Sequence, residues 1–226
     1  MLHMKYDWIL FDADETLFYF DAFKGLQLMF SRYNVAFSDA DFKQYELINR
    51  PLWVQYQNGD ISASELQQTR FREWAKKLKT TEQQLNDDYM QAMADICEVL
   101  PGTTSLIHSL NGRVKLGIIT NGFTALQKIR LEKTGLADYF DLLVISEQVG
   151  VAKPDRRIFE YSLEKMGNPA PTSVLMVGDN PQSDILGGIN AGLDTCWFNH
   201  QNQLLPENIK PTYQVSTLSE LEKILV

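Results

Sequence analysis

The chain has 226 residues, of which 44% are hydrophobic and 22% charged, so it can bury a core and is not expected to be disordered or fibrous. Its formal net charge of −8 argues against binding of nucleic acid through phosphate contacts, although a small phosphorylated ligand needs only local positive charge. Cys97 and Cys196 show no disulfide or metal-site spacing, which fits a reducing compartment. With no secretory signal or membrane span evident, we predict a cytoplasmic protein without a membrane partner.

The chain opens with a buried strand that runs into acidic residues. Residues 8–11 are apolar or aromatic, and Asp12 and Asp14 follow. Side chains two positions apart on a strand point the same way, so these carboxylates share a small volume and repel each other unless a cation or proton joins them. This stretch alone leaves two interpretations. The pair belongs to a site, or it only solvates the strand end or caps a helix that starts near Thr16.

Residues 18–99 are predicted to be all helical. Apolar residues recur there at spacings of three and four, without a convincing alternation of period two. Ser38 and Ser62 are expected helix starts, because each is followed three residues later by an acidic residue, and residues 58–60 are an expected turn. The segment therefore looks like a separate inserted domain, and most of its aromatic residues are expected to form its own core.

From residue 100 onward, strand-like and helix-like segments alternate. The predicted strands are 114–120, 142–146, 173–179 and a final one at 195–198. The predicted helices are 103–110, 125–134 (ended by Gly135), 158–166, 183–191 and 218–225. Such alternation predicts an α/β fold with a doubly wound, Rossmann-like parallel sheet and helices on both faces, in which ligands bind beyond the carboxyl ends of the strands.

Polar residues follow several of these strands and are expected to meet at that edge. They are Asp12, Asp14, Thr120, Asn121, Gly122, Lys153, Asp179 and Asp184. Carboxylates from two strand ends suit Mg²⁺, which commonly binds one or two carboxylates together with a substrate phosphate. A hydroxyl, backbone amides and a lysine could hold the phosphate oxygens. With the other strand ends included, the interpretation of the first two aspartates as a cap becomes weaker.

These residues resemble the motifs of the haloacid dehalogenase (HAD) superfamily. The four matching motifs, in the family's order, are Asp12-Ala13-Asp14-Glu15-Thr16, Ile118-Ile119-Thr120-Asn121-Gly122, Val151-Ala152-Lys153-Pro154 and Gly178-Asp179 with Asp184. Each motif alone is weak, whereas four in order are specific. The resemblance implies a catalytic core made of residues 1–17 and 100–226, and a helical cap at 18–99. Glu15 departs from the pattern, because many members have glycine there.

The resemblance implies hydrolysis of a phosphate monoester. Asp12 would be the nucleophile and form an aspartyl-phosphate, and Asp14 would protonate the leaving alkoxide and then activate water. Thr120 and Lys153, with Asn121 and Gly122, would hold the phosphoryl oxygens.

The resemblance also implies a metal cofactor. Mg²⁺ would be bound by Asp12, the backbone carbonyl of Asp14, and Asp179, with Mn²⁺ or Co²⁺ able to substitute. Asp184 would orient Lys153 or a metal-bound water.

The whole chain is similar to bacterial HAD-type 5′-nucleotidases that prefer pyrimidine nucleoside monophosphates, including deoxy and non-standard ones. The similarity includes residues 51–59 in the predicted cap and residues 186–193. That resemblance implies a nucleotidase. A base needs an apolar wall and a few polar groups. Candidates for these are Phe18, Phe23, Asn49, Trp53 and Tyr56, although each taken singly is better explained as cap core.

Alternatives remain open at this stage. A sugar-phosphate or phosphoglycolate phosphatase would use the same chemistry with a smaller, more polar cap surface. A 2-haloacid dehalogenase is less favoured, because a halide leaves without a proton and needs no acid at Asp14. A non-catalytic phosphate-binding module would have no use for both Asp12 and Asp14.

The remaining features carry little prediction. His3, His108 and His200 are too scattered for a metal site, and the proposed chemistry needs none of them. The loop at 199–211 follows the last predicted strand, and it either touches substrate or is a plain connection. A monomer and a homodimer are both compatible with the sequence.

Overall fold

The computed structural model describes residues 4–226, so Met1–His3 lie outside the described residues. It contains two compact units. The α/β unit comprises the chain up to Tyr19, Glu98–Gly122 and Leu131–Val226, and the helical unit comprises Phe20–Cys97 and Phe123–Arg130. The second segment of the helical unit belongs to a stretch that the sequence analysis assigned to the core. The roles of catalytic core and cap stay a prediction.

The α/β unit is built on a parallel sheet. Within residues 4–226 this sheet has six strands in the order β3-β2-β1-β4-β5-β6, and every pairing is parallel. The strands are β1 (Trp8–Phe11), β2 (Lys115–Thr120), β3 (Leu142–Ile145), β4 (Val174–Gly178), β5 (Asp194–Phe198) and β6 (Tyr213–Val215). The predicted α/β class is confirmed. The prediction that the strand at 195–198 is the last one is wrong, because the short β6 pairs beside it.

One of the two central strands is β1, which pairs with β2 on one side and with β4, the other central strand, on the other. All four of its side chains are buried, as its apolar sequence predicts for a strand covered on both faces. Trp8 lies opposite Lys115 and Val174, and Phe11 lies opposite Ile118 and Val177. The carboxyl ends of β1, β2 and β4 therefore lie side by side.

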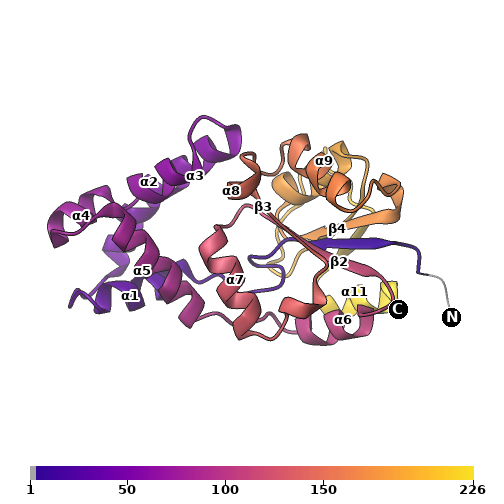
Figure 1. The fold of residues 1–226 in the computed structure, drawn as a ribbon, viewed down its shortest axis with the longest axis horizontal. Helices are drawn as coiled ribbons and strands as arrows, with labels where there is room; N and C mark the ends of the chain where they lie inside the picture. The colour runs from indigo at the N-terminus through magenta and orange to yellow at the C-terminus, as the bar shows by residue number, and fades with distance from the viewer. Residues whose placement is uncertain (1–3) are drawn as a thin grey trace. The chain divides into compact units, whose positions relative to one another are not determined.

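Helices lie on both sides of this sheet. Those of the α/β unit are α6 (Thr103–Leu110), α8 (Ser146–Val149), α9 (Arg156–Lys165), α10 (Gly187–Asn190) and α11 (Leu218–Leu225). Figure 1 shows α6 and α11 together on one side of the sheet and α9 on the other. The helix predicted at 183–191 is two elements, a π-helical turn η3 (Pro181–Leu186) followed by α10. Two 3-10 turns, η1 (Ala137–Tyr139) and η2 (Pro171–Ser173), complete the unit.

The segment 18–99, predicted to be all helical, is helical without strands over residues 20–97, whereas its two ends, Phe18 and Val99, pair in an isolated antiparallel bridge. The helices of the helical unit are α1 (Ala22–Ser31), α2 (Asp39–Asn58), α3 (Ala63–Thr69), α4 (Arg72–Leu78), α5 (Glu82–Asp95) and the first part of α7 (Thr124–Lys133). Ser38 and Ser62 both form capping boxes, with Asp41 and Glu65 respectively, so both predicted helix starts are confirmed. Gly59 ends α2 in a left-handed conformation.

The structure excludes the capping interpretation of the acidic pair. Among the described residues the first helix begins at Ala22 and is capped by the side chain of Asp21, which accepts a hydrogen bond from the backbone amide of Lys24 at 2.9 Å. Asp12 and Asp14 therefore cap no helix near Thr16. Across residues 4–226, the helices are all too short or too polar to span a bilayer.

Candidate active site

Asp12 stands at the carboxyl end of β1. Its backbone amide donates a hydrogen bond to the carbonyl of Val177 at 2.8 Å, so the β1–β4 ladder fixes its backbone. The residue is only 8% exposed. A carboxylate buried to this degree requires a partner of opposite charge, a proton or a metal ion.

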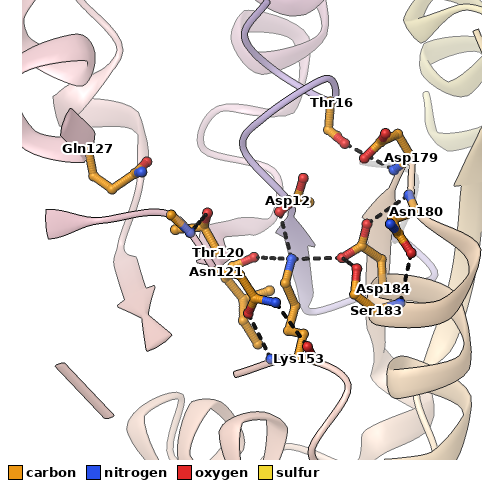
Figure 2. Close-up of polar contacts among 12 residues, drawn as sticks. Asp12, Thr16, Thr120, Asn121, Gln127, Lys153, Asp179, Asn180, Ser183 and Asp184 are labelled. Carbon is orange, nitrogen blue, oxygen red and sulfur yellow. Dashed lines mark hydrogen bonds and ion pairs between the residues drawn. The ribbon is translucent and has the colours of Figure 1, made fainter. Parts of the chain in front are cut away.

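Lys153 supplies that charge. Its Nζ donates to Asp12 Oδ1 at 2.6 Å and to Asp184 Oδ1 at 2.7 Å, as Figure 2 shows, and it also donates to the carbonyl of Ile119 at 2.7 Å. An ammonium group has three protons, and these three acceptors use all of them. The side chain is 1% exposed. Lys153 thus links the ends of β1 and β2 to the segment after β4.

A side chain beyond β2 holds the backbone of the lysine. Asn121 accepts from the amide of Lys153 through Oδ1 at 2.7 Å, and its Nδ2 donates to the carbonyl of Lys153 at 2.9 Å. Beside it, Thr120 is 1% exposed, and its Oγ1 accepts from the amide of Gly122 at 3.0 Å. A hydroxyl that accepts one bond still has its own proton to donate. Thr120 is therefore suited to bind an oxyanion.

The segment after β4 brings in Asp184. A Cβ on Gly178 would lie 2.3 Å from Asp184 Oδ2 and 2.5 Å from its Cβ, so the close approach requires glycine. Asp184 Oδ2 accepts from the amide of Asn180 at 3.0 Å, and its Oδ1 accepts from Ser183 Oγ at 3.2 Å as well as from the lysine. Both oxygens of Asp184 are thus engaged, which favours a supporting role for this residue.

The backbone of Asp179 is held by Thr16, the last residue of the first motif, and by Trp197, to which the sequence assigned no role. Its amide donates to Thr16 Oγ1 at 3.1 Å, and its carbonyl accepts from Trp197 Nε1 at 2.8 Å. Thr16 is fully buried and Trp197 is 1% exposed. These bonds connect β4 to the turn after β1 and to β5. Their partners are distant in sequence, so no local pattern announces them.

The electrostatics of the cluster point to a cation site. Carboxylate oxygens of Asp12, Asp179 and Asp184 lie within 4.8 Å of one another. Burial, opposed by Lys153, raises the pKa of Asp12 to about 7, and burial together with Asp12 raises that of Asp179 to about 9. Burial alone lowers the pKa of Lys153, but Asp12 and Asp184 more than offset it. One lysine does not neutralise three carboxylates, so hard oxygen ligands remain for a metal ion.

Asp14 lies two residues beyond Asp12 and is half-buried. It forms an isolated parallel bridge with Phe18, so the chain turns back sharply after it. Its charge contributes to the raised pKa of Asp12. Thus the residues predicted at the strand ends all belong to the α/β unit.

The candidates for a base-binding wall are divided between the units. Phe18 belongs to the α/β unit and is 1% exposed. In the helical unit, Phe23 contacts Phe42 with ring centroids 5.0 Å apart, and Trp53 stacks on Phe123 at 5.2 Å with Tyr56 at its edge. Asn49, also in α2, donates to Glu46 Oε1 at 3.4 Å, whereas its Oδ1 is buried without a hydrogen-bond partner.

Comparison with protein families agrees with this geometry. The family model described as haloacid dehalogenase-like hydrolase matches residues 6–192, which include the carboxyl ends of β1, β2 and β4 together with Lys153 and Asp184. The chain belongs to this family. Relatives of this HAD-like hydrolase match nearly its full length, so the similarity includes the helical unit.

The relatives include two nucleotidases. The chain is 59% identical over 222 residues to the pyrimidine 5′-nucleotidase YjjG of Escherichia coli, covering 98% of this chain and 99% of the relative. It is 34% identical to the pyrimidine 5′-nucleotidase PynA of Streptococcus pneumoniae, covering 96% and 94%. Among solved structures, the magnesium-bound HAD-hydrolase YfnB of Bacillus subtilis is 32% identical, with a TM-score of 0.84 and coverage of 97% and 98%.

Proposed function

We propose that this HAD-like hydrolase is a Mg²⁺-dependent 5′-nucleotidase that converts pyrimidine nucleoside 5′-monophosphates, including deoxy and non-standard ones, to nucleoside and phosphate. The observation that carries the substrate class is the 59% identity to a pyrimidine 5′-nucleotidase over nearly the full length of both chains. The cluster of Asp12, Lys153 and Asp179 supports the reaction type, because it combines a buried carboxylate with groups that can bind a phosphate and a metal ion.

In the first step, an oxygen of Asp12 attacks phosphorus and the bond from phosphorus to the ester oxygen breaks. Asp14 gives its proton to the departing alkoxide, so the nucleoside leaves as an alcohol. The phosphoryl oxygens accept hydrogen bonds from the Thr120 hydroxyl and from the backbone amide of Asn121, and Lys153 offsets their negative charge. The amide of Gly122 instead donates to Thr120 Oγ1 and so orients that hydroxyl.

In the second step, Asp14 takes a proton from a water molecule whose oxygen attacks phosphorus. The bond between phosphorus and Asp12 breaks, which releases phosphate and restores both carboxyl groups. A halide would leave without a proton, so the acid at Asp14 favours ester hydrolysis over dehalogenation.

The donor set fits magnesium, which prefers carboxylate and carbonyl oxygens. Asp12, Asp179 and the backbone carbonyl of Asp14 would hold the ion, and Asp184 would keep its bonds to Lys153 and Asn180. The bound ion would supply positive charge that neutralises phosphate oxygens during transfer. Mn²⁺ and Co²⁺ accept the same ligands and are expected to substitute.

The helical unit is proposed as the cap that selects the substrate. Trp53, Tyr56 and Phe23 offer aromatic faces for a pyrimidine ring, and Asn49 offers an amide for its polar edge. Phe18, in the α/β unit, is 1% exposed and therefore too buried to contact a base. A sugar-phosphate or phosphoglycolate substrate would need less aromatic surface.

The test is phosphate release from a panel of monophosphates with Mg²⁺. The panel includes UMP, dUMP, dTMP, purine nucleotides, sugar phosphates and phosphoglycolate, with a 2-haloacid assayed for halide release. Asp12→Asn should abolish turnover, because it removes the nucleophile. The matched control is Asp60→Asn, which makes the same change at an exposed turn of the helical unit and should leave turnover intact.

Each outcome decides a different part of the proposal. Fast hydrolysis of pyrimidine nucleotides, lost with Asp12→Asn and on chelation, would support it in full. Turnover of sugar phosphates alone would keep the chemistry and reject the nucleotide assignment. Halide release, or no turnover at all, would reject the phosphatase reaction itself.

A further inference from the structure

Glu15 occupies an unusual backbone position beside the proposed acid. Its φ is +57°, in the left-handed region that side chains other than glycine, asparagine and aspartate rarely adopt. Its amide donates to the carbonyl of Phe18 at 2.7 Å, which closes the turn that begins at Asp14. Glycine is the residue that fits this conformation without strain. A glutamate held here therefore calls for a favourable interaction of its side chain.

The side chain of Glu15 is held from the loop that follows β5. Gln201 Nε2 donates to Glu15 Oε2 at 3.2 Å, and His200 Nε2 lies 3.5 Å from the same oxygen. Glu15 and His200 keep only 26% and 21% of their side-chain surface exposed. Partial burial limits the screening of this contact by solvent.

The loop itself is braced to present these two groups. Asn199 closes it by accepting from the amide of Gln203 at 2.8 Å and donating to the carbonyl of Gln203 at 3.0 Å. Gln203 Nε2 donates to Gln201 Oε1 at 2.9 Å, which orients the amide of Gln201 so that its Nε2 faces Glu15. His200 stacks on Phe198, with ring centroids 4.9 Å apart and planes at 21°.

We infer that Glu15 is a positioning residue for the proposed reaction: its carboxylate, clamped by Gln201 and His200, ties loop 199–203 to the turn that carries Asp14. This inference rests on the proposed function, because it gives Asp14 a proton to transfer. A general acid acts only within hydrogen-bond reach of its target, and small displacements reduce its contribution strongly. The clamp holds the turn in one conformation although its backbone position favours glycine.

The test uses the dependence of an acid on the leaving group. p-Nitrophenolate leaves phosphorus without protonation, whereas the alkoxide of a nucleoside monophosphate needs a proton. The ratio kcat/KM reports the steps up to formation of the aspartyl-phosphate, so it isolates the acid role of Asp14. Asp14→Asn should lower kcat/KM for the nucleotide far more than for p-nitrophenyl phosphate, because a general acid is worth about 10²–10⁴-fold.

Glu15→Ala should also lower kcat/KM more for the nucleotide than for p-nitrophenyl phosphate, but by a smaller factor than Asp14→Asn. We expect kcat/KM to fall roughly tenfold or more for the nucleotide and less than about twofold for p-nitrophenyl phosphate. The control is Asn168→Ala, because Asn168 also has a left-handed backbone, with φ of +56°, but lies in the turn after α9. This control should leave both ratios unchanged.

A second variant removes the clamp from the loop side and leaves the backbone at Glu15 untouched. His200→Phe combined with Gln201→Met keeps a ring on Phe198 and removes both groups that contact the carboxylate. This variant should reproduce the selective loss. Adding Glu15→Ala to it should produce little further change, because partners in one contact are not additive.

The results distinguish failure of the positioning role of Glu15 from failure of the proposed function. Selective loss in Asp14→Asn, but equal or no loss in the Glu15 and loop variants, would overturn the inference and leave the proposed function standing. Equal loss for both substrates in Asp14→Asn, or hydrolysis of p-nitrophenyl phosphate without any alkyl phosphate, would overturn both. Selective loss in all three supports the clamp.

Discussion

Replacing Lys153 by methionine tests how the site balances its charges. The change removes three hydrogen bonds, to Asp12, Asp184 and the carbonyl of Ile119, and leaves two carboxylates that are 8% and 1% exposed. Removing one partner of a buried ion pair typically costs about 3–5 kcal/mol. We expect a loss of this size in the free energy of unfolding of the metal-free protein above neutral pH.

The loss should depend on pH with a definite sign. The pKa of Asp12 is already raised to about 7, first by burial, although Lys153 lowers it. Without the lysine this pKa rises further above its unfolded value. The folded variant then keeps a proton on Asp12 up to a higher pH, whereas the unfolded chain has already lost it. The stability of the variant therefore falls with rising pH over a wider pH range than that of the wild type. The difference between variant and wild type should therefore grow from about pH 6 to about pH 8.5.

Urea unfolding in the presence of a chelator measures this difference. The matched control is Lys223→Met, an exposed lysine near the end of α11, which should change stability by less than about 0.5 kcal/mol. Adding Asp184→Asn to the Lys153 variant should recover part of the loss, since one of the two buried charges disappears. A Lys153→Met cost below about 1 kcal/mol at the higher pH, or the same cost at both pH values, would contradict the charge argument.

Three further predictions follow from other parts of the structure. Gly178→Ala should destabilise the α/β unit by about 1–3 kcal/mol and reduce turnover, because the new Cβ would lie 2.3 Å from Asp184 Oδ2. Chemical denaturation measures the loss of stability, and phosphate release measures the loss of turnover. In the presence of a chelator, the melting temperature should fall as pH rises from about 5 to 9, because folding raises the pKa of Asp12 to about 7 and that of Asp179 to about 9. Saturating Mg²⁺ should flatten this pH dependence, and a melting temperature independent of pH in chelator would refute the raised pKa values. Ser38→Ala should cost about 1 kcal/mol in unfolding of the helical unit, because it removes the cap that accepts a bond from the third amide of α2; an unchanged urea midpoint would contradict this.

The sequence predicted those parts of the fold that depend on local pattern. The run at 8–11 reads as a strand buried on both faces and is one, and the acidic residues three positions after Ser38 and Ser62 predicted capping boxes that the structure contains. Strand β6 was missed because it has only three residues, of which one is exposed and one buried, which is too short a pattern. The turn η3 was missed because a π-helical turn and an α-helix share similar composition.

Contacts between distant residues explain what the sequence could not supply. The predicted site residues lie at strand ends, so a topological rule for parallel sheets was enough to group them. By contrast, Thr16 supports Asp179 across 163 positions and Gln201 reaches Glu15 across 186. Neither pair carries a spacing that a single sequence reveals. His200 likewise has no neighbour in sequence that would single it out.

The central place of β1 in the sheet has a consequence for how the protein forms during synthesis. This strand leaves the ribosome well before its neighbours β2 and β4, which begin only at Lys115 and Val174. Its four apolar side chains therefore stay uncovered until most of the chain has been synthesised. The helical unit consists largely of one continuous segment and can collapse earlier through local contacts. The nascent chain thus exposes this apolar segment, which becomes paired on both sides only when β4 emerges.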